Sequence, residues 1–126
     1  MTIFIVDDDS AIRDSLKFLL ESEGLETEDF ASGTEFMGQG RPRDDDCIIL
    51  DVQMPGMSGI EVLARLRRTG SISPVIIATS LPSPATTRRA YSAGAFRVLD
   101  KPFDSNALLG AVHEALHVAH NLHQSG

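Results

Sequence analysis

Short apolar runs and longer segments of helical period alternate along this 126-residue chain, and this alternation limits the fold more than any other feature. Three runs are strongly apolar, IFIV at 3–6, CIIL at 47–50 and VIIA at 75–78, and two are weaker, LETEDF at 25–30 and FRVL at 96–99. Strands that alternate with helices favour parallel pairing, because each helix carries the chain back to the end where the previous strand began. Five strands and five helices in this order predict an α/β fold, a doubly wound parallel sheet covered on both faces.

The segments between the runs carry the signals of helices with defined ends. In the first segment, apolar residues recur at helical spacing at Ile12, Leu16, Leu19 and Leu20. Three segments are followed by a glycine that can terminate a helix in the left-handed conformation: Gly24, Gly70 and Gly94.

Two helix starts are marked by S-x-x-E capping boxes. Ser32 is followed by Glu35, and Ser58 is followed by Glu61. In such a box the serine side chain accepts a backbone N–H of the first helical turn. These boxes predict helices that begin near residues 33 and 59.

The last helix is predicted from about residue 105 to about residue 120. One face of it is apolar: Leu108, Val112, Leu116 and Ala119. His113, His117 and His120 recur at helical spacing beside that face, with His123 beyond them. Such spacing can bind a metal, but no carboxylate or cysteine completes a ligand set. We interpret these histidines as a solvated or partner-facing flank that could add pH sensitivity.

Length, composition and charge narrow the class of protein. A chain of 126 residues with 42% hydrophobic residues suffices for a single domain over residues 1–126 with its own core. The N-terminal apolar run is too short for a signal peptide or a membrane span, so we expect a cytoplasmic protein without membrane contact. The only cysteine, Cys47, lies in an apolar run and is predicted to be a small buried residue. A net charge of −7 without a basic stripe argues against direct contact with nucleic acid.

Polar residues follow most of the predicted strands. In a parallel sheet the carboxyl ends of the strands share one edge, so residues that follow different strands become neighbours. This geometry gathers eight residues: Asp7, Asp8 and Asp9 after the first strand, Asp51 after the third, Thr79 and Ser80 after the fourth, and Lys101 and Pro102 after the fifth. A second acidic triplet, Asp44–Asp46, precedes its strand, and we expect it in a solvated loop at the opposite end of the sheet.

The aspartates at the carboxyl edge call for a cation. Carboxylates that converge in one crevice raise each other's pKa unless positive charge lies among them. Mg²⁺ prefers carboxylates, a carbonyl and water, and no histidine or cysteine stands at a strand end to indicate zinc. We therefore expect Mg²⁺, with Mn²⁺ as the alternative. A lysine, a hydroxyl and a metal around one aspartate would also receive three phosphoryl oxygens, so that this aspartate could act as nucleophile and form an acyl phosphate.

Four segments carry these residues in order: IVDDDSAIRDSLKFLLES, IILDVQMPGMSGIEVL, PVIIATS and AGAFRVLDKPF. Asp8, Asp51, Thr79 and Lys101 are separated in turn by 43, 28 and 22 residues. In motif and separation, residues 3–120 resemble the receiver domain of two-component response regulators, most closely those of FixJ-like transcriptional regulators. The resemblance implies a flavodoxin-like sheet with the strand order 2-1-3-4-5.

The resemblance also implies roles at the acidic site. Asp51 is similar to the family's phosphoacceptor. Asp8 is similar to the carboxylate that ligates Mg²⁺ directly, and Asp7 to the neighbour that holds metal-bound water. The backbone carbonyl of Gln53 is expected to be another ligand. Asp9 lies one position past the matching pair, and we interpret it as the pocket edge or a cap for the first helix.

Two further residues match the family's switch. Lys101 resembles the lysine that pairs with the acceptor and then with a phosphoryl oxygen, and its bond to Pro102 is expected to be cis. Thr79 resembles the hydroxyl that moves to hydrogen-bond the phosphoryl group. The resemblance predicts a signalling domain that catalyses its own phosphotransfer and slow dephosphorylation, and not an enzyme with a separate substrate.

Two features depart from the family pattern. Val98 stands where the family usually has an aromatic residue, and Phe96, two positions earlier, is expected to point the same way by strand alternation. Pro82 and Pro84 fall in the loop after Thr79, where we expect them to stiffen the loop or preset one of its states.

The resemblance implies partners as well. A sensor histidine kinase is the expected phosphoryl donor. The face of the fourth helix, fifth strand and fifth helix is the expected contact with an output domain, a partner protein or a second copy of the chain. Arg88, Arg89 and Tyr91 lie on that fourth helix, although an ordinary exposed helix explains them equally well. No helix-turn-helix pattern follows, so we expect a stand-alone receiver or a piece of a longer regulator, with transcription as the controlled output and no DNA-binding domain within the chain.

Two other functions stay open. Asp7-x-Asp9 after a strand is similar to the opening motif of Mg²⁺-dependent phosphohydrolases of the haloacid dehalogenase type, although Ala11 stands where that motif has Thr or Val. The second is an interaction module, a pseudo-receiver that is never phosphorylated. The complete set of predicted site residues argues against it.

Overall fold

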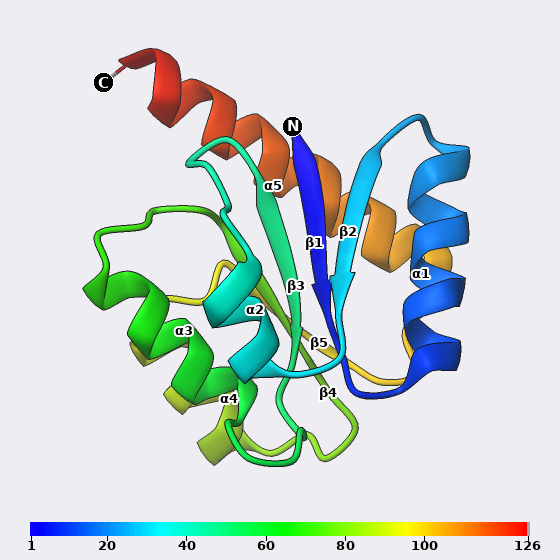
Figure 1. Cartoon of the computed structure of the whole chain (residues 1–126), viewed down its shortest axis with the longest axis vertical. Coiled ribbons are helices and arrows are strands. Elements are labelled where there is room, and N and C mark those ends of the chain that lie inside the picture. The colour runs from blue at the N-terminus through cyan, green and yellow to red at the C-terminus, as the bar shows by residue number, and fades with distance from the viewer. Residues whose placement is uncertain (126) are drawn as a thin grey trace.

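Five parallel strands form one sheet with helices on both faces, as the sequence predicts (Figure 1). The computed structural model describes the backbone of residues 1–125 and the side chains of residues 1–120. The elements are β1 (Thr2–Val6), α1 (Ser10–Ser22), β2 (Glu26–Phe30), α2 (Gly33–Gln39), β3 (Cys47–Asp51), α3 (Gly59–Arg68), β4 (Val75–Thr79), α4 (Pro84–Ser92), β5 (Arg97–Asp100) and α5 (Ser105–Ser125). The strand order β2-β1-β3-β4-β5 confirms the predicted one.

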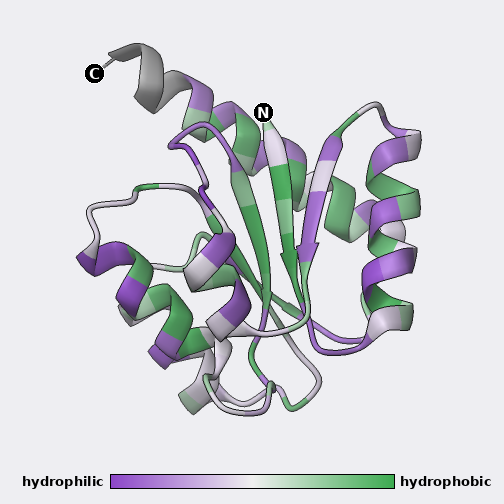
Figure 2. Ribbon diagram, viewed as in Figure 1, coloured by the Kyte–Doolittle hydropathy of each residue, from purple (hydrophilic) through white to green (hydrophobic). Residues whose placement is uncertain are grey.

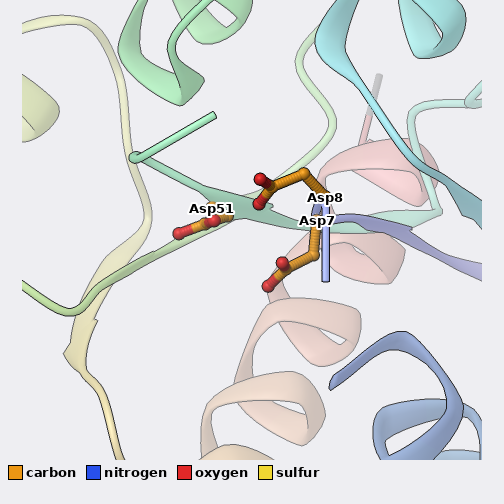
Figure 3. A group of neighbouring side chains, drawn as sticks. All are labelled: Asp7, Asp8 and Asp51. Carbon is orange, nitrogen blue, oxygen red and sulfur yellow. The ribbon is translucent and has the colours of Figure 1, made fainter. Parts of the chain in front are cut away.

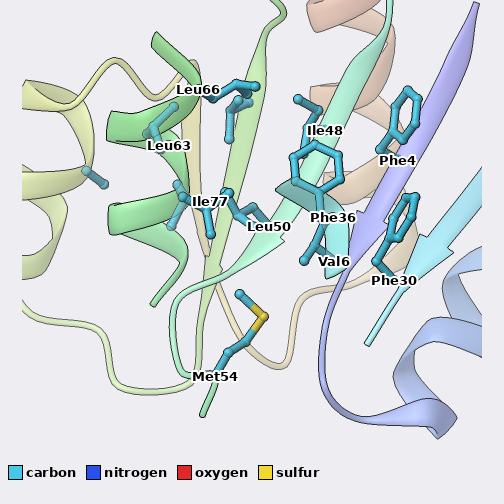
Figure 4. Close-up of a cluster of buried hydrophobic side chains, with 13 residues drawn as sticks. Phe4, Val6, Phe30, Phe36, Ile48, Leu50, Met54, Leu63, Leu66 and Ile77 are labelled. Carbon is cyan, nitrogen blue, oxygen red and sulfur yellow. The ribbon is translucent and has the colours of Figure 1, made fainter. Parts of the chain in front are cut away.

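Neighbouring residues of the central strands pack on opposite faces of the sheet. Phe4, Ile48 and Ile77 belong to the cluster under α2, α3 and α4, which Figure 4 shows in close-up. Ile49 and Ile76 pack on the other face, against α1 and α5. The central strands are therefore buried on both sides, which explains their continuous apolar runs. Figure 2 shows the contrast with the edge strand β2, which is largely hydrophilic.

The predicted helix starts and terminators are confirmed. Ser32 and Ser58 accept hydrogen bonds from the backbone N–H groups of Glu35 and Glu61, and α2 and α3 begin at the residue after each serine. The three predicted terminators have positive φ angles: 82° at Gly24, 91° at Gly70 and 109° at Gly94. Such angles strain any residue with a Cβ atom, which explains glycine at these positions.

Two helix boundaries differ from the prediction. α5 continues past the predicted end near His120 to Ser125, because neither proline nor glycine stands between these residues to stop it. Pro84, predicted to lie in the loop after Thr79, is the first residue of α4, where its fixed φ suits a helix start. Pro82 alone lies in the loop.

Phe96 and Val98 pack on opposite faces of the sheet, so the prediction that they point the same way was wrong. β5 begins at Arg97, and strand alternation does not extend to the residue before the strand. Phe96 packs with the cluster of α1 and α5, whereas Val98 packs with the cluster of α2, α3 and α4. Phe96 therefore does not replace an aromatic side chain at position 98.

The acidic triplet Asp44–Asp46 lies before β3, at the amino end of the sheet, but it is not solvated throughout. Asp44 is exposed, whereas Asp46 is buried, with 5% of its surface accessible. Asp46 Oδ1 accepts the backbone N–H of Thr2, and Oδ2 accepts that of Arg43, each at 2.7 Å. The predicted solvated loop was wrong for Asp46, because two backbone donors take the place of water at its carboxylate.

The structure also bears on two expectations from composition. Cys47 is a buried residue as predicted, and burial raises the pKa of its thiol to about 12. Among residues 1–125, none of the helices combines the length and apolar character of a membrane-spanning segment.

Candidate functional site

Three carboxylates meet at the carboxyl edge of the sheet. β1 and β3 are adjacent, with Val6 opposite Leu50, so Asp7 and Asp51 follow these residues side by side. Oxygens of Asp7, Asp8 and Asp51 lie within 4.8 Å of one another. Figure 3 shows the three side chains gathered where the two strands end. The structure thus brings together the three aspartates that the sequence predicts at one site.

Two of these carboxylates are buried and one is exposed. Asp7 and Asp51 have 3% and 4% of their surface accessible, whereas Asp8 faces solvent. Burial, and next the charge of Asp7, raise the pKa of Asp51 above its usual value, although the charge of Lys101 opposes them. The ionised form of Asp51 is therefore costly, and additional positive charge at the site would stabilise it.

Lys101 bridges the two buried carboxylates. Its Nζ lies 2.8 Å from Asp7 Oδ2 and 3.2 Å from Asp51 Oδ1. The bond between Lys101 and Pro102 is cis, as expected, and the Lys101 N–H donates to the carbonyl of Thr79. Burial alone would lower the pKa of Lys101, but the hydrogen bond to Asp7 and the charges of Asp51 and Asp7 raise it. The predicted pair with Asp51 is present, but the shorter contact, with Asp7, was not predicted.

Asp51 Oδ1 is a buried carboxylate oxygen that accepts no well-formed hydrogen bond. Among the described side chains it is the buried polar atom without a hydrogen-bond partner, although the Lys101 ammonium lies within ion-pair range. A buried carboxylate oxygen with an ion pair but no well-formed hydrogen bond is incompletely satisfied, and a further cation or ligand would complete it. The possible metal ligands at this site are oxygens of three carboxylates. Carboxylate oxygens bind hard dications in preference to soft ones. The residues present therefore fit Mg²⁺ or Mn²⁺.

Asp9 does more than mark the pocket edge. Its carboxylate caps α1 by accepting the N–H groups of Ala11 at 2.9 Å and Ile12 at 3.4 Å, which is one of its two predicted roles. Its own backbone N–H donates to Asp7 Oδ1 at 2.9 Å, a contact that the sequence did not indicate. Because the Asp9 carboxylate is engaged at the helix start and does not belong to the acidic group, the D-x-D interpretation finds no support in the structure.

Thr79 is fully buried, and the side chain of Gln53 holds its hydroxyl. Gln53 Nε2 lies 3.1 Å from Thr79 Oγ1, which also accepts the N–H of Leu81 at 3.1 Å. Gln53 Oε1 accepts the N–H of Ser80 at 3.1 Å. From the sequence, only the backbone carbonyl of Gln53 was expected at the site. No pattern could have indicated its side chain, because the contact spans 26 residues and joins the loop after β3 to the last residue of β4.

Gly59 lets α3 approach the strand that ends in Asp51. A Cβ atom at this position would collide with the backbone carbonyl oxygen of Asp51. The Gly59 N–H donates to the carbonyl of Val52 at 3.1 Å, which fixes the loop after β3. Close backbone approach thus explains the glycine in the sequence Met57-Ser58-Gly59, whose role at the site was not predicted.

The histidines of α5 were predicted to be a solvated or partner-facing flank. Among the described residues, the one group that could hold a metal is the acidic group at the sheet edge, and His113, His117 and His120 are not part of it. All three have exposed side chains. His123 lies outside the residues whose side chains are described.

Comparison with known proteins points to one family. A family model described as the response regulator receiver domain matches residues 3–113. The transcriptional regulatory protein FixJ of Azorhizobium caulinodans is 40% identical over 116 residues, which cover 92% of this chain and 55% of that protein. The chain thus spans about half the length of this relative.

Solved structures agree in fold. The response regulator StyR superposes with a TM-score of 0.91 and 39% identity, over 98% of this chain and 63% of that chain. The chemotaxis protein CheY4 of Vibrio cholerae superposes with a TM-score of 0.81 and 31% identity, over 91% of this chain and 98% of that chain. The flavodoxin-like architecture predicted from the sequence is therefore shared with both.

Proposed function

This chain belongs to the family of response regulator receiver domains, like those of the FixJ-like transcriptional regulators, and we propose that it is a switch operated by phosphorylation of Asp51. The observation that carries the proposal is the environment of Asp51. Its carboxylate is buried beside Asp7 and Lys101, yet Oδ1 accepts no hydrogen bond. Beside its ion pair with Lys101, this oxygen keeps a lone pair for an electrophile or a divalent cation.

In the proposed reaction an oxygen of Asp51 attacks the phosphorus of a phosphohistidine on a sensor kinase. A bond forms between this oxygen and phosphorus while the bond between phosphorus and the imidazole nitrogen breaks, and the nitrogen keeps that electron pair. Lys101, 3.2 Å from Asp51 Oδ1, can follow the charge to a phosphoryl oxygen. The product is an acyl phosphate on Asp51.

A divalent cation belongs to the same proposal. Asp8 and Asp51 would hold Mg²⁺ or Mn²⁺ directly together with the backbone carbonyl of Gln53, and Asp7 would act through water. When bound, the cation neutralises charge on the carboxylates and on the phosphoryl oxygens. The chain itself keeps Asp7 in place, through Lys101 at Oδ2 and the Asp9 N–H at Oδ1.

Thr79 is the proposed switch. Its hydroxyl now bonds Gln53 and Leu81 and makes no hydrogen bond to Asp51. To reach a phosphoryl oxygen it would leave Gln53, which would also free the loop at Ser80. Movement of this loop would carry the signal to α4, which starts at Pro84.

The domain supplies much of its own catalysis in this proposal. Lys101 and the acidic group are assembled before any phosphoryl donor arrives, so transfer from a small donor requires no residue of a kinase. Slow loss of the phosphoryl group to water would reset the switch. The domain is thus a signalling protein that modifies itself, and it releases no product other than phosphate.

The partners follow from the family. A sensor histidine kinase is the proposed donor, and the face of α4, β5 and α5 is the proposed contact with an output domain, a partner or a second copy of the chain. On α4, Tyr91 is 46% exposed, and Arg88 and Arg89 are exposed as well. We propose one receiver domain over residues 1–126 without a DNA-binding domain. A reducing, cytoplasmic location belongs to the proposal, since the single cysteine is buried and unpaired.

Incubation with acetyl phosphate and Mg²⁺, followed by measurement of the intact mass, tests the proposal. We expect the wild-type protein to gain one phosphoryl group and Asp51→Asn to be labelled at least about 100-fold more slowly, because an amide is not a nucleophile for this transfer. Asp44→Asn, an exposed carboxylate at the other end of the sheet, is the matched control and should be labelled like the wild type. An unmodified wild-type protein, or undiminished labelling of Asp51→Asn, would contradict the proposal.

A further inference from the structure

Arg13 joins the acidic site to the edge of the sheet. It lies in the first turn of α1, four residues after Asp9, and only 17% of its side chain is exposed. Its Nη1 donates to the backbone carbonyl of Asp7 at 2.7 Å, and its Nε donates to Asp29 Oδ2 at 3.1 Å. The same guanidinium therefore holds the backbone of the acidic site and a carboxylate of β2.

Asp29 gives this contact a rigid base. It lies on β2, in register with Ile5 of β1, and it also pairs with Lys17 at 3.1 Å. Burial alone would raise the pKa of Asp29, but the hydrogen bonds and charges of Lys17 and Arg13 lower it. Asp29 thus stays ionised and fixes the direction of the guanidinium. Lys17 also pairs with Asp29 but makes no described hydrogen bond to the acidic site, so a variant at Lys17 is a suitable control.

The carbonyl that Arg13 holds belongs to the peptide between Asp7 and Asp8. The other parts of Asp7 are held elsewhere: its N–H donates to Phe30 at 3.1 Å, and its carboxylate accepts from Lys101 and from the Asp9 N–H. Asp8 is exposed, so its direction depends on this peptide plane. Among residues 1–120, Arg13 is the side chain that donates to the carbonyl of this peptide.

We propose that Arg13 is a positioning residue that orients the peptide of Asp7 and Asp8 and thereby sets the affinity of the acidic site for a divalent cation. The inference rests on the proposed function in so far as the acidic group must bind Mg²⁺. Groups that orient metal ligands without touching the metal contribute substantially to affinity in other metal sites.

The direction of the change in Mg²⁺ affinity on replacement of Arg13 distinguishes a positioning role from an effect of its charge. Arg13 is a cation close to carboxylates, so charge alone predicts that its removal strengthens Mg²⁺ binding. Positioning predicts the opposite, because the peptide plane loses its anchor. A role confined to joining α1 with β2 predicts lower stability with unchanged Mg²⁺ affinity.

Calorimetric titration of the 126-residue protein with Mg²⁺ tests the inference. We expect Arg13→Gln to bind Mg²⁺ about 10-fold more weakly than the wild type. Lys17→Gln, which also removes one cation from Asp29, should bind Mg²⁺ within about 2-fold of the wild type. Labelling by acetyl phosphate should show the same difference between the two variants. Arg13→Gln should be labelled slowly at limiting Mg²⁺ and approach the wild-type rate at saturating Mg²⁺.

A second variant covers the case in which Arg13→Gln does not fold. Arg13→Lys keeps the charge but has one ammonium in place of the fork that reaches both Asp7 and Asp29. It should also bind Mg²⁺ more weakly than the wild type. Equal or tighter binding by Arg13→Gln, or wild-type affinity in Arg13→Lys, would overturn the inference alone. Absence of Mg²⁺ binding by the wild-type protein would instead overturn the proposed function, and the inference with it.

Discussion

Two acidic triplets occupy opposite ends of the same sheet, and only one of them has the character of a site. Asp7–Asp9 follows β1, and Asp44–Asp46 precedes β3. Each contains a buried carboxylate, Asp7 in the first and Asp46 in the second, with 3% and 5% of the surface accessible. Neither composition nor burial therefore distinguishes them.

The difference lies in the groups that satisfy the buried oxygens. Both oxygens of Asp46 accept backbone N–H groups from its own surroundings, at 2.7 Å each. At the other end, Asp7 meets a second buried carboxylate, Asp51, and the two share the ammonium of Lys101 while Asp51 Oδ1 keeps no hydrogen bond. Backbone donors complete a carboxylate as a structural group, whereas crowded carboxylates with one shared cation leave room for a ligand. Three changes would break or sharpen this contrast.

The largest effect is expected on the affinity for the divalent cation. Asp8→Asn removes the exposed carboxylate of the acidic group, and we expect it to weaken Mg²⁺ binding by about 100-fold, because a hard dication depends on charged oxygen ligands. Asp44→Asn, an exposed member of the other triplet, should change the affinity by less than about 2-fold. Calorimetric titration measures both, and equal losses in the two variants would show that overall charge, and not the site, governs binding.

The next effect concerns stability at the amino end. Asp46→Ala leaves the N–H groups of Thr2 and Arg43 without acceptors, and we expect a loss of about 2–3 kcal/mol in the free energy of unfolding. Asp44→Ala should stay within about 0.5 kcal/mol of the wild type. Urea unfolding followed by circular dichroism measures both values. A loss below about 0.5 kcal/mol in Asp46→Ala would mean that water replaces the carboxylate without cost.

The smallest effect has the opposite sign. In the absence of Mg²⁺, we expect Asp51→Asn to raise the free energy of unfolding, by less than Asp46→Ala lowers it, because the change removes a buried charge that faces Asp7. Asp46→Asn is the matched control and should be less stable than the wild type, since its amide cannot accept both backbone N–H groups. A destabilised Asp51→Asn at neutral pH would show that the pair with Lys101 outweighs the burial cost.

The stabilisation by Asp51→Asn also depends on pH. The folded-state pKa of Asp51 is raised above the usual value of 3.8, so the native state binds the proton more tightly than the unfolded chain. The loss in the free energy of unfolding that ionised Asp51 causes in the wild type is therefore fully present above the raised folded-state pKa. It shrinks as the pH falls through that pKa, and it vanishes below 3.8. Unfolding curves of both proteins with a chelator present should converge in this direction, and divergence at low pH would refute the assignment to Asp51.

Much of the fold could be predicted because its signals are local. The apolar runs, the capping boxes at Ser32 and Ser58 and the terminating glycines placed most element ends within a residue or two of the structure. Two of the errors occurred where a local rule was extended beyond its element. Strand alternation was applied to Phe96, which precedes β5, and loop character was assigned to Pro84, which begins α4.

The site was predictable in membership but not in its internal contacts. Strand ends of a parallel sheet meet at one edge, so Asp7, Asp8 and Asp51 could be placed together from topology alone. The bridge from Lys101 to Asp7, the bond between Gln53 and Thr79, and the contact from Arg13 to the Asp7 carbonyl could not. Each of these depends on the path of a long side chain across a space that the sequence does not specify.

The sequence by itself determined which residues share an edge of the sheet, because the order of strands and helices dictates topology and topology dictates neighbours. Only the tertiary structure decided which buried carboxylate would have hydrogen-bond donors at both of its oxygens. Asp46 and Asp51 are buried aspartates at the two ends of β3, but the N–H groups of Thr2 and Arg43 converge on Asp46, whereas Asp51 faces Asp7 and a shared lysine. Hydrogen bonds act over about 3 Å, a scale at which side-chain direction counts and residue order does not.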